Sequence, residues 1–113
     1  MKTITKNELI ASAQTRQMKA YYIELERVLD RVERSALYYQ ILNVDRQASL
    51  DSVKLAYQHL IATLFPPYKI SAGIPEEMLS RMGRAFEKAS RAFSVLALAT
   101  KRTEYDGVLM SRP

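Results

Sequence analysis

The first 65 residues of this chain contain neither glycine nor proline. These two residue types most often interrupt helices and strands, so a segment of this length without them favours long helices. Nowhere do apolar and polar residues alternate between turn residues, as they would in a half-buried strand. The chain has 113 residues, 48% of them hydrophobic, which suffices for one domain with its own core. The sequence therefore predicts a single all-α domain.

An apolar stripe runs through the N-terminal third of the chain. Its members recur every three or four residues, as on one face of a helix: Met18, Tyr22, Leu25, Leu29, Val32, Ala36 and Tyr39. The phase is kept across Ser35, which predicts one amphipathic helix over about residues 6 to 41, roughly 50 Å long at 1.5 Å per residue. Ser35 is also a good N-cap residue. The alternative is therefore a break there, with the first helix folded back over the rest of the domain.

Further helices are predicted on either side of the prolines. Ser49 is a candidate N-cap for a helix that ends before Pro66, because a residue preceding proline disfavours helical geometry. The apolar face of that helix is Val53, Ala56, Tyr57, Leu60, Ile61 and Leu64. Pro75 opens the next helix, whose predicted stripe is Leu79, Met82, Phe86, Ala89, Phe93 and Leu96. A short last helix is expected after Thr100.

Several short motifs resemble those of J-domains, the helical domains of DnaJ-type proteins, in both order and spacing. Leu-Tyr-Tyr-Gln-Ile-Leu-Asn-Val at 37 to 44 resembles the opening of the domain, and residues 48 to 57 resemble the start of its second helix. Its third helix and its close are matched by Phe86, Ala92-Phe93, Val95-Leu96, Lys101-Arg102 and Tyr105-Asp106.

The resemblance implies an antiparallel hairpin of the second and third helices with short helices packed across it. The residues expected to meet inside the hairpin are Tyr57, Leu60, Phe86, Ala89 and Phe93. The predicted organisation is an N-terminal amphipathic helix over residues 1–35, a J-domain-like domain over 36–108 and a tail over 109–113.

The resemblance fails at the loop that carries the signature of the family. In J-domains a tyrosine and His-Pro-Asp end the second helix, and this loop engages a DnaK-type chaperone and triggers its ATP hydrolysis. The aligned residues here are Leu64, Phe65, Pro66 and Pro67. A phenyl ring replaces the imidazole, and a proline replaces the carboxylate that would pair with a basic partner group. The sequence therefore predicts a J-domain-like protein without the ATPase-stimulating motif.

The functional expectation is a protein–protein interaction or regulatory module in a chaperone network, with a DnaK-type chaperone or another J-protein as partner. The candidate partner-binding residues are Lys54, His59, Phe65, Tyr68 and Lys69. A helix of the predicted length would overhang a small domain, and an exposed apolar stripe is generally covered by another chain. The candidate surface for a homodimer or a partner helix is Met18, Tyr22, Leu25, Leu29 and Val32.

Other classes of function have less support. The chain has no cysteine and a single histidine, so neither a metal nor another cofactor is expected. It has no glycine-rich phosphate loop and no sign of a hydrolytic triad, so no enzyme activity is expected. The net charge of +5 is spread along the chain rather than gathered on one face, which favours ordinary solvated helix faces over nucleic-acid binding. A basic nucleic-acid-binding protein is kept as an alternative, as is a divergent DnaK-type co-chaperone.

Membrane contact is not expected either. No apolar run approaches the roughly 20 residues of a spanning helix, and the N-terminus lacks the apolar segment of a secretory signal. The sequence predicts a soluble cytoplasmic protein.

Overall fold

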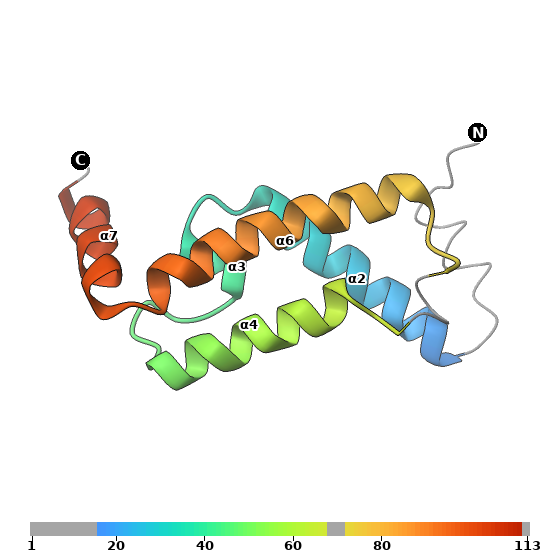
Figure 1. The fold of residues 1–113 in the computed structure, drawn as a ribbon, viewed down its shortest axis with the longest axis horizontal. Helices are drawn as coiled ribbons and strands as arrows, with labels where there is room; N and C mark the ends of the chain where they lie inside the picture. Colours follow the sequence, from blue (N-terminus) through green and yellow to red (C-terminus); the bar gives the residue numbers. More distant parts are fainter. Residues whose placement is uncertain (1–15, 68–71, 112–113) are drawn as a thin grey trace.

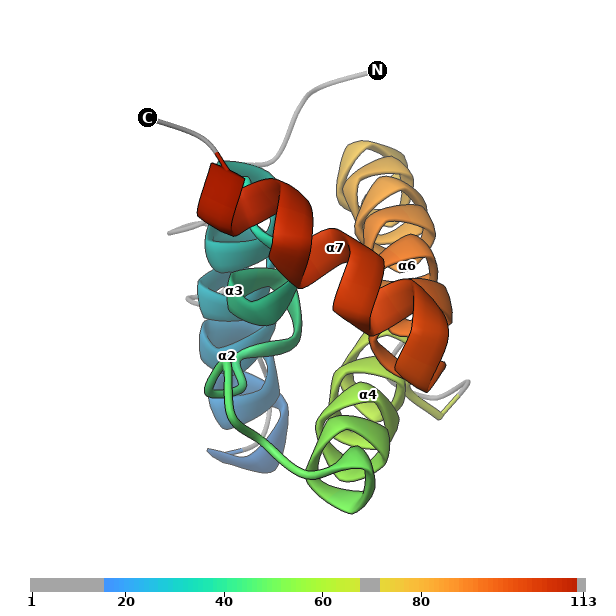
Figure 2. The same ribbon diagram turned by 90° about the vertical axis from the view of Figure 1, so that its left-hand side faces the viewer.

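The computed structural model describes residues 16–67 and 72–111. Within these ranges it contains five helices and no strand: α2 (Arg16–Arg34), α3 (Tyr38–Leu42), α4 (Leu50–Leu64), α6 (Glu76–Leu96) and α7 (Ala99–Ser111). Figures 1 and 2 show two layers, with α2 and α3 on one side, the antiparallel α4–α6 hairpin on the other, and α7 across one end. The predicted all-helical fold is confirmed.

The ends of the hairpin helices follow from the local sequence. Ser49 is the N-cap of α4, and its Oγ accepts a hydrogen bond from the backbone N–H of Ser52 at 3.1 Å. The chain leaves the helical conformation at Phe65, with φ −128° and ψ 71°, because Pro66 follows. Glu76 and Glu77 lie in the first turn of α6, where their charges complement the helix dipole.

The core is one apolar cluster to which four helices contribute. Its helical members are Tyr22, Leu25, Val28, Leu29 and Val32 of α2, Tyr39, Ile41 and Leu42 of α3, Val53, Leu60 and Leu64 of α4, and Met78, Met82, Ala85, Ala89, Ala92 and Leu96 of α6. The N-terminal helix therefore belongs to the same packed unit as the hairpin.

The helix α2 ends at Arg34, so the prediction of one helix continuing through Ser35 is wrong. The backbone N–H and the Oγ of Ser35 both donate to the carbonyl of Arg31, at 3.0 and 2.6 Å. Lys88 Nζ of α6 donates to the carbonyls of Val32 and Ser35, at 2.7 and 3.1 Å, and so satisfies acceptors that the helix end leaves open. The predicted start of the helix near residue 6 lies outside the described residues.

Because the chain turns at Ser35, the predicted oligomerisation face is covered by its own domain. Leu25, Leu29 and Val32 are fully buried, Tyr22 is 4% exposed, and Met18 packs partly buried against the same core. The helix α2 contacts both α4 and α6. The fold-back alternative is therefore correct, and an overhanging stripe that needs a second chain is not.

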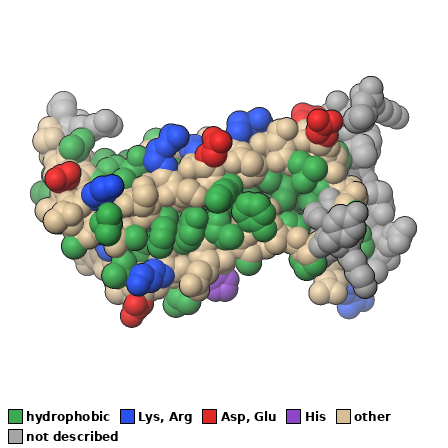
Figure 3. Space-filling view, in the orientation of Figure 1, with side chains coloured by type: hydrophobic (Ala, Val, Ile, Leu, Met, Phe, Trp, Pro, Cys, Tyr) green, Lys and Arg blue, Asp and Glu red, His purple; other side chains and the backbone are tan. Residues whose placement is uncertain are grey.

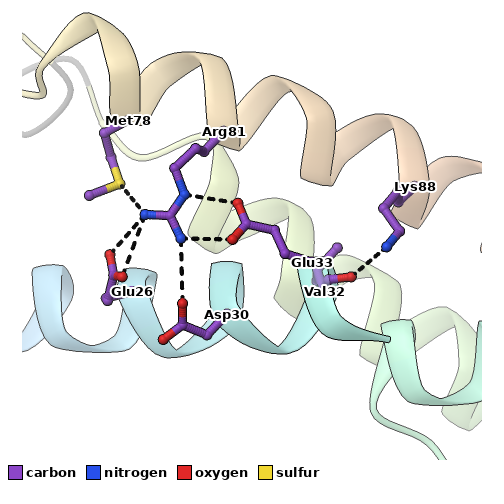
Figure 4. A network of polar contacts seen from close by, with 7 residues as sticks. All are labelled: Glu26, Asp30, Val32, Glu33, Met78, Arg81 and Lys88. Atoms are coloured by element: carbon purple, nitrogen blue, oxygen red, sulfur yellow. Dashed lines mark hydrogen bonds and ion pairs between the residues drawn. The ribbon is translucent and has the colours of Figure 1, made fainter. Parts of the chain in front are cut away.

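A cluster of charges around Arg81 holds α2 to α6 (Figure 4). The Arg81 guanidinium lies 2.8 Å from a Glu33 carboxylate oxygen, 3.2 Å from one of Glu26 and 3.4 Å from one of Asp30. All three carboxylates come from one face of α2, because they are spaced four and three residues apart. Hydrogen bonds to Glu33 raise the pKa of Arg81, and the same contact lowers the pKa of Glu33.

The last helix is anchored to α3 by tyrosines. The Tyr38 and Tyr105 rings stack with centroids 4.6 Å apart, and the Tyr105 hydroxyl accepts a hydrogen bond from the Tyr38 backbone N–H. Tyr39 donates to an Asp106 carboxylate oxygen at 2.6 Å. The helix α7 continues to Ser111, so residues 109–111 are helical rather than part of the predicted tail.

The register of α6 differs in part from the predicted stripe. Met82, Ala89 and Leu96 are buried as predicted, but Leu79 is 43% exposed and Met78 is buried in its place. Ala85 and Ala92 are buried, whereas the larger Phe86 and Phe93 lie partly buried beside the core. The reason is that α6 packs against α2 and α3 as well as α4, so its small residues face the helices of the other layer.

Candidate functional site

The candidate signature loop leaves the C-terminal end of α4. Leu64 is 3% exposed, whereas the neighbouring Phe65 is 60% exposed. The Phe65 ring meets Phe86 of α6 edge-on, with centroids 5.1 Å apart. Pro66 and Pro67 follow, and neither phenylalanine nor proline has a side chain that can carry charge or exchange a proton. The loop therefore offers shape and apolar surface rather than acid–base chemistry.

Phe65 belongs to a row of aromatic rings between α4 and α6, on the side of the hairpin away from α2. Tyr57 and Phe93 stack with centroids 4.2 Å apart and planes 11° apart, and the Tyr57 hydroxyl lies 3.0 Å from Ser90 Oγ. Figure 3 shows hydrophobic side chains forming a band between the two helices on this side. We call Tyr57, Phe65, Phe86 and Phe93 the aromatic face.

An apolar hollow of about 250 Å³ lies at the Phe65 end of the aromatic face. It is lined by Leu64, Phe65 and Pro66 at the end of α4 and by Leu79, Met82 and Gly83 of α6. A Cβ atom at Gly83 would meet no heavy atom of another part of the described chain within 4 Å, so the wall is open there. Exposed apolar side chains gathered around a hollow are typical of surfaces that receive an apolar side chain of another protein.

The structure separates the predicted partner-binding residues. Lys54 and Phe65 are both exposed and lie on the same side of α4, since eleven residues are about three helical turns. His59 lies toward the other layer, where it lines a cavity with Glu24 and Arg31 of α2. Tyr68 and Lys69 lie outside the described residues.

The residues on the α6 side of the hollow were not predicted as surface residues from the sequence. Leu79 and Met82 were predicted as core residues of α6, and nothing in the sequence marked Gly83. The exposure of Leu79 follows from the register of α6, which depends on packing against α2 and α3. Only a prediction that already placed α2 in the domain would have found it.

The part of the chain that the structure describes offers neither a membrane span nor a metal site. No helix in ranges 16–67 and 72–111 is long and apolar enough to cross a membrane. In the same ranges, no group of three acidic or histidine side chains is arranged to hold a metal ion.

The profile of the DnaJ domain matches residues 37–106, more than half of the chain. The chain belongs to the DnaJ-domain family. The match begins at Leu37, the residue before α3, and ends within α7. The J-domain of this chain therefore comprises α3, α4, α6 and most of α7, and α2 precedes it.

Several curated relatives are similar to the chain. Human DnaJ homolog subfamily B member 12 is 33% identical over 88 residues, which are 78% of this chain and 21% of that protein. The chaperone protein DnaJ of Listeria welshimeri is 33% identical over 69 residues, which are 61% of this chain and 16% of that protein. Human DnaJ homolog subfamily C member 18 is 29% identical over 102 residues, which are 90% of this chain and 26% of that protein. No solved structure matches the chain.

The extent of these matches adds two facts. The chain spans only a small part of each relative, between 16% and 26% of their lengths. The 102 residues matched to DnaJ homolog subfamily C member 18 exceed the J-domain, and must include part of the segment before residue 37 because the chain from there to its end is shorter. DnaJ domains are non-enzymatic co-chaperone modules, which confirms the expectation that this domain is not an enzyme.

Proposed function

We propose that this J-domain does not stimulate ATP hydrolysis by a DnaK-type chaperone and acts instead as a protein-interaction or regulatory module of a chaperone network. The observation that carries the proposal is the tripeptide after α4, where Phe65-Pro66-Pro67 stands in place of His-Pro-Asp. The chain contains no His-Pro-Asp sequence elsewhere, since its one histidine, His59, precedes Leu60.

The charge of the exposed face of α4 supports the same proposal. Complementary charge drives the encounter of protein partners, and the basic second helix typical of the family would supply it. Here that face offers Lys54 and, one turn on, the uncharged Gln58, while His59 lies toward the other layer. The helix thus lacks the charge density that attracts an acidic partner surface.

The surface that takes the place of these groups is apolar. We propose that a partner, either a DnaK-type chaperone or another J-protein, inserts an apolar side chain into the hollow between Phe65 and Leu79. Burial of apolar area stabilises such a contact. The contact brings no charged or proton-exchanging group to the partner, so we expect it to leave the partner's ATP hydrolysis unchanged. We also propose that the protein acts in the cytoplasm.

The decisive experiment is single-turnover ATP hydrolysis by a DnaK-type chaperone with this protein in excess. We expect the rate to stay at that of the chaperone alone, while an intact J-domain run in parallel accelerates it. An acceleration matching the intact J-domain would contradict the proposal and favour a divergent co-chaperone. The double variant Phe65→His/Pro67→Asp should recover only weak stimulation, because the face around Lys54 stays poor in charge.

The binding half of the proposal is tested with two matched leucines. A partner captured from cell extract by the tagged protein should be lost on Leu79→Asp, which places a charge in the hollow. It should be retained on Leu98→Asp, since Leu98 is similarly exposed, at 50%, but does not line the hollow. Equal retention by both variants would reject the hollow as the docking site.

A further inference from the structure

Arg31 of α2 is a half-buried cation with little compensation among the described residues. Its Nη2 lies 3.4 Å from the carbonyl oxygen of Ile41, and its Nε is buried without a hydrogen-bond partner in this part of the chain. None of the four ion pairs among described residues includes it. A buried donor without an acceptor destabilises a fold, and one that carries charge does so more strongly.

Two hollows meet at this side chain. One, of about 450 Å³, is lined by Arg31, Arg34, Ser35, Gln40 and Asn43. Every one of these side chains can donate a hydrogen bond, and none carries negative charge. The other, of about 320 Å³, also includes Arg31 and Asn43 in its wall and extends between α2 and α4. Both volumes are many times the roughly 30 Å³ that a water molecule occupies in the liquid.

The position of Arg31 at the end of a helix does not explain its environment. Basic residues in the last turn complement the helix dipole, and both Arg31 and Arg34 lie there. However, Lys88 already bonds the carbonyls of Val32 and Ser35 at this end. The dipole accounts for a positive charge, but not for a buried guanidinium N–H without an acceptor.

Among the described residues that line the two hollows, Glu24 is the acidic one. It lines the second cavity, and its charge opposes the lowering of the Arg31 pKa that burial causes. Its carboxylate is paired instead with Arg27, at 3.4 Å, in an exposed contact. Glu24 therefore moderates the positive charge of the site without neutralising it through a direct bond.

We propose that the donor-lined hollow between α2 and α3 binds an oxyanion of the phosphate class, either free phosphate or the phosphate group of a small monoester. A guanidinium donates charge-assisted hydrogen bonds to the oxygens of a phosphate. Arg34, Gln40 and Asn43 supply donors for the remaining oxygens. In a monoester the organic part enters the adjoining cavity, whose apolar wall includes Leu42, Ala56 and Leu60.

This site is separate from the aromatic face. Its lining residues belong to α2, α3 and the turns that follow them, whereas the rings of the aromatic face come from α4, α6 and Phe65. Figure 2 shows α2 and α3 beside the α4–α6 hairpin. Loss of one function by substitution is therefore expected to leave the other in place.

The test is a titration of the full chain with inorganic phosphate and, separately, with phosphoserine, at constant ionic strength against a chloride reference. Calorimetry measures affinity, and backbone amide shifts locate the ligand. We expect saturable binding of both probes with shifts at Arg31, Ser35 and Asn43. A tighter response to phosphoserine assigns the adjoining cavity to the organic part, whereas equal affinities assign the site to the phosphate group alone.

Substitutions make the test specific. Arg31→Met keeps the apolar stem and should weaken binding roughly tenfold or more, as expected for loss of a charge-assisted pair. Arg91→Met removes the same charge from an exposed position of α6 that lines neither hollow, and should change the affinity less than about twofold, the screened effect of a distant charge. Glu24→Gln should strengthen binding, an effect that a purely structural role of Arg31 would not produce.

The proposal is overturned if phosphate binding is not saturable, or if Arg31→Met and Arg91→Met bind alike. Circular dichroism checks that each variant is folded. If Arg31→Met fails to fold, Arg34→Gln and Glu24→Gln decide the matter, since both positions are exposed. Opposite changes in affinity for these two variants support the site, and no change in either rejects it.

Discussion

Phe93 acts at once as a core residue and as a surface residue. One face of its ring stacks on Tyr57 at 4.2 Å, and the side chain is partly buried against the core. We expect Phe93→Ala to lower the free energy of unfolding by about 3 kcal/mol, the low end of the range for truncated aromatics, because the ring is not fully buried. Urea denaturation measures this loss. A loss below about 1 kcal/mol would show that the ring does not hold the hairpin together.

Tyr21 couples the stability of the domain to alkaline pH. Its hydroxyl donates to the carbonyl of Thr63 at 2.7 Å, and burial raises the pKa of Tyr21 to about 12 from 10.0. Because the folded pKa lies above the unfolded one, this residue contributes stability that is fully present below pH 10 and is lost as the pH rises toward 12. The pKa of Tyr39 is raised by burial and by its bond to Asp106, so Tyr39 adds to the same decline.

Thermal melts of the parent and of Tyr21→Phe between pH 9 and 12 measure this effect. We expect the variant to lose stability less steeply across this window, and Tyr39 still contributes to the decline that remains. Parallel curves for the two proteins would show that Tyr21 titrates with the same pKa in the folded and unfolded chains.

At the scale of the helices, one arginine makes several ion pairs between α2 and α6. Arg81 joins α2 to α6 through three carboxylates, and the Glu26 side chain, 12% exposed, is the least solvated of them. Replacing Arg81 by Met leaves Glu26 partly buried without its cation, and we expect a loss of about 2 kcal/mol in the free energy of unfolding. Arg84→Met, at an exposed position one turn on, should cost less than about 0.5 kcal/mol. Denaturant melts of both variants would contradict this if their losses were equal.

The elements themselves were predictable to different degrees. The cap at Ser49, the end of α4 before Pro66 and the contact of Tyr57 with Phe93 follow from local rules and from motif spacing, and all are present. The end of α2 was not predictable from periodicity, because the apolar phase continues through Ser35. The carbonyls of Val32 and Ser35 at this end accept hydrogen bonds from Lys88, more than 50 residues away in sequence, and apolar periodicity does not reveal such a contact.

The candidate site shows the same division. The exposed Phe65 and its neighbouring prolines were identified from the sequence, because motif spacing marks their place. The hollow beside Phe65 was not, since the exposure of Leu79 depends on which face of α6 turns toward α2. The burial of Arg31 depends on the same fold-back. A helix that extends into solvent would leave this guanidinium exposed, so the sequence pattern does not predict its environment.

At the scale of the whole molecule, the fold-back of α2 predicts a monomer. Leu25 is fully buried between the layers, whereas Ile23 on the same helix is 42% exposed. We expect Leu25→Asp to unfold the domain, because an unpaired buried carboxylate costs several kcal/mol of a total stability of roughly 5–15 kcal/mol. Ile23→Asp should stay folded. Circular dichroism and melts distinguish the two outcomes.

Size exclusion with light scattering tests the monomer directly. A single mass of one chain at high micromolar concentration is the expected result. A stable dimer that Leu25→Asp dissociates into folded monomers would contradict the packing of α2 described above.

The placement of α2 has a consequence for how the protein is made. Arg81, which clamps α2 at Glu26, follows it by 55 residues in the sequence. At a synthesis rate of roughly 5–20 residues per second, Glu26 leaves the ribosome about 3 to 11 seconds before Arg81 does. During that interval the α2 stripe of tyrosine, leucine and valine side chains cannot complete its packing, because α6 is missing. A member of a family named for chaperones thus presents, in its own nascent chain, an apolar segment of the kind that chaperones bind.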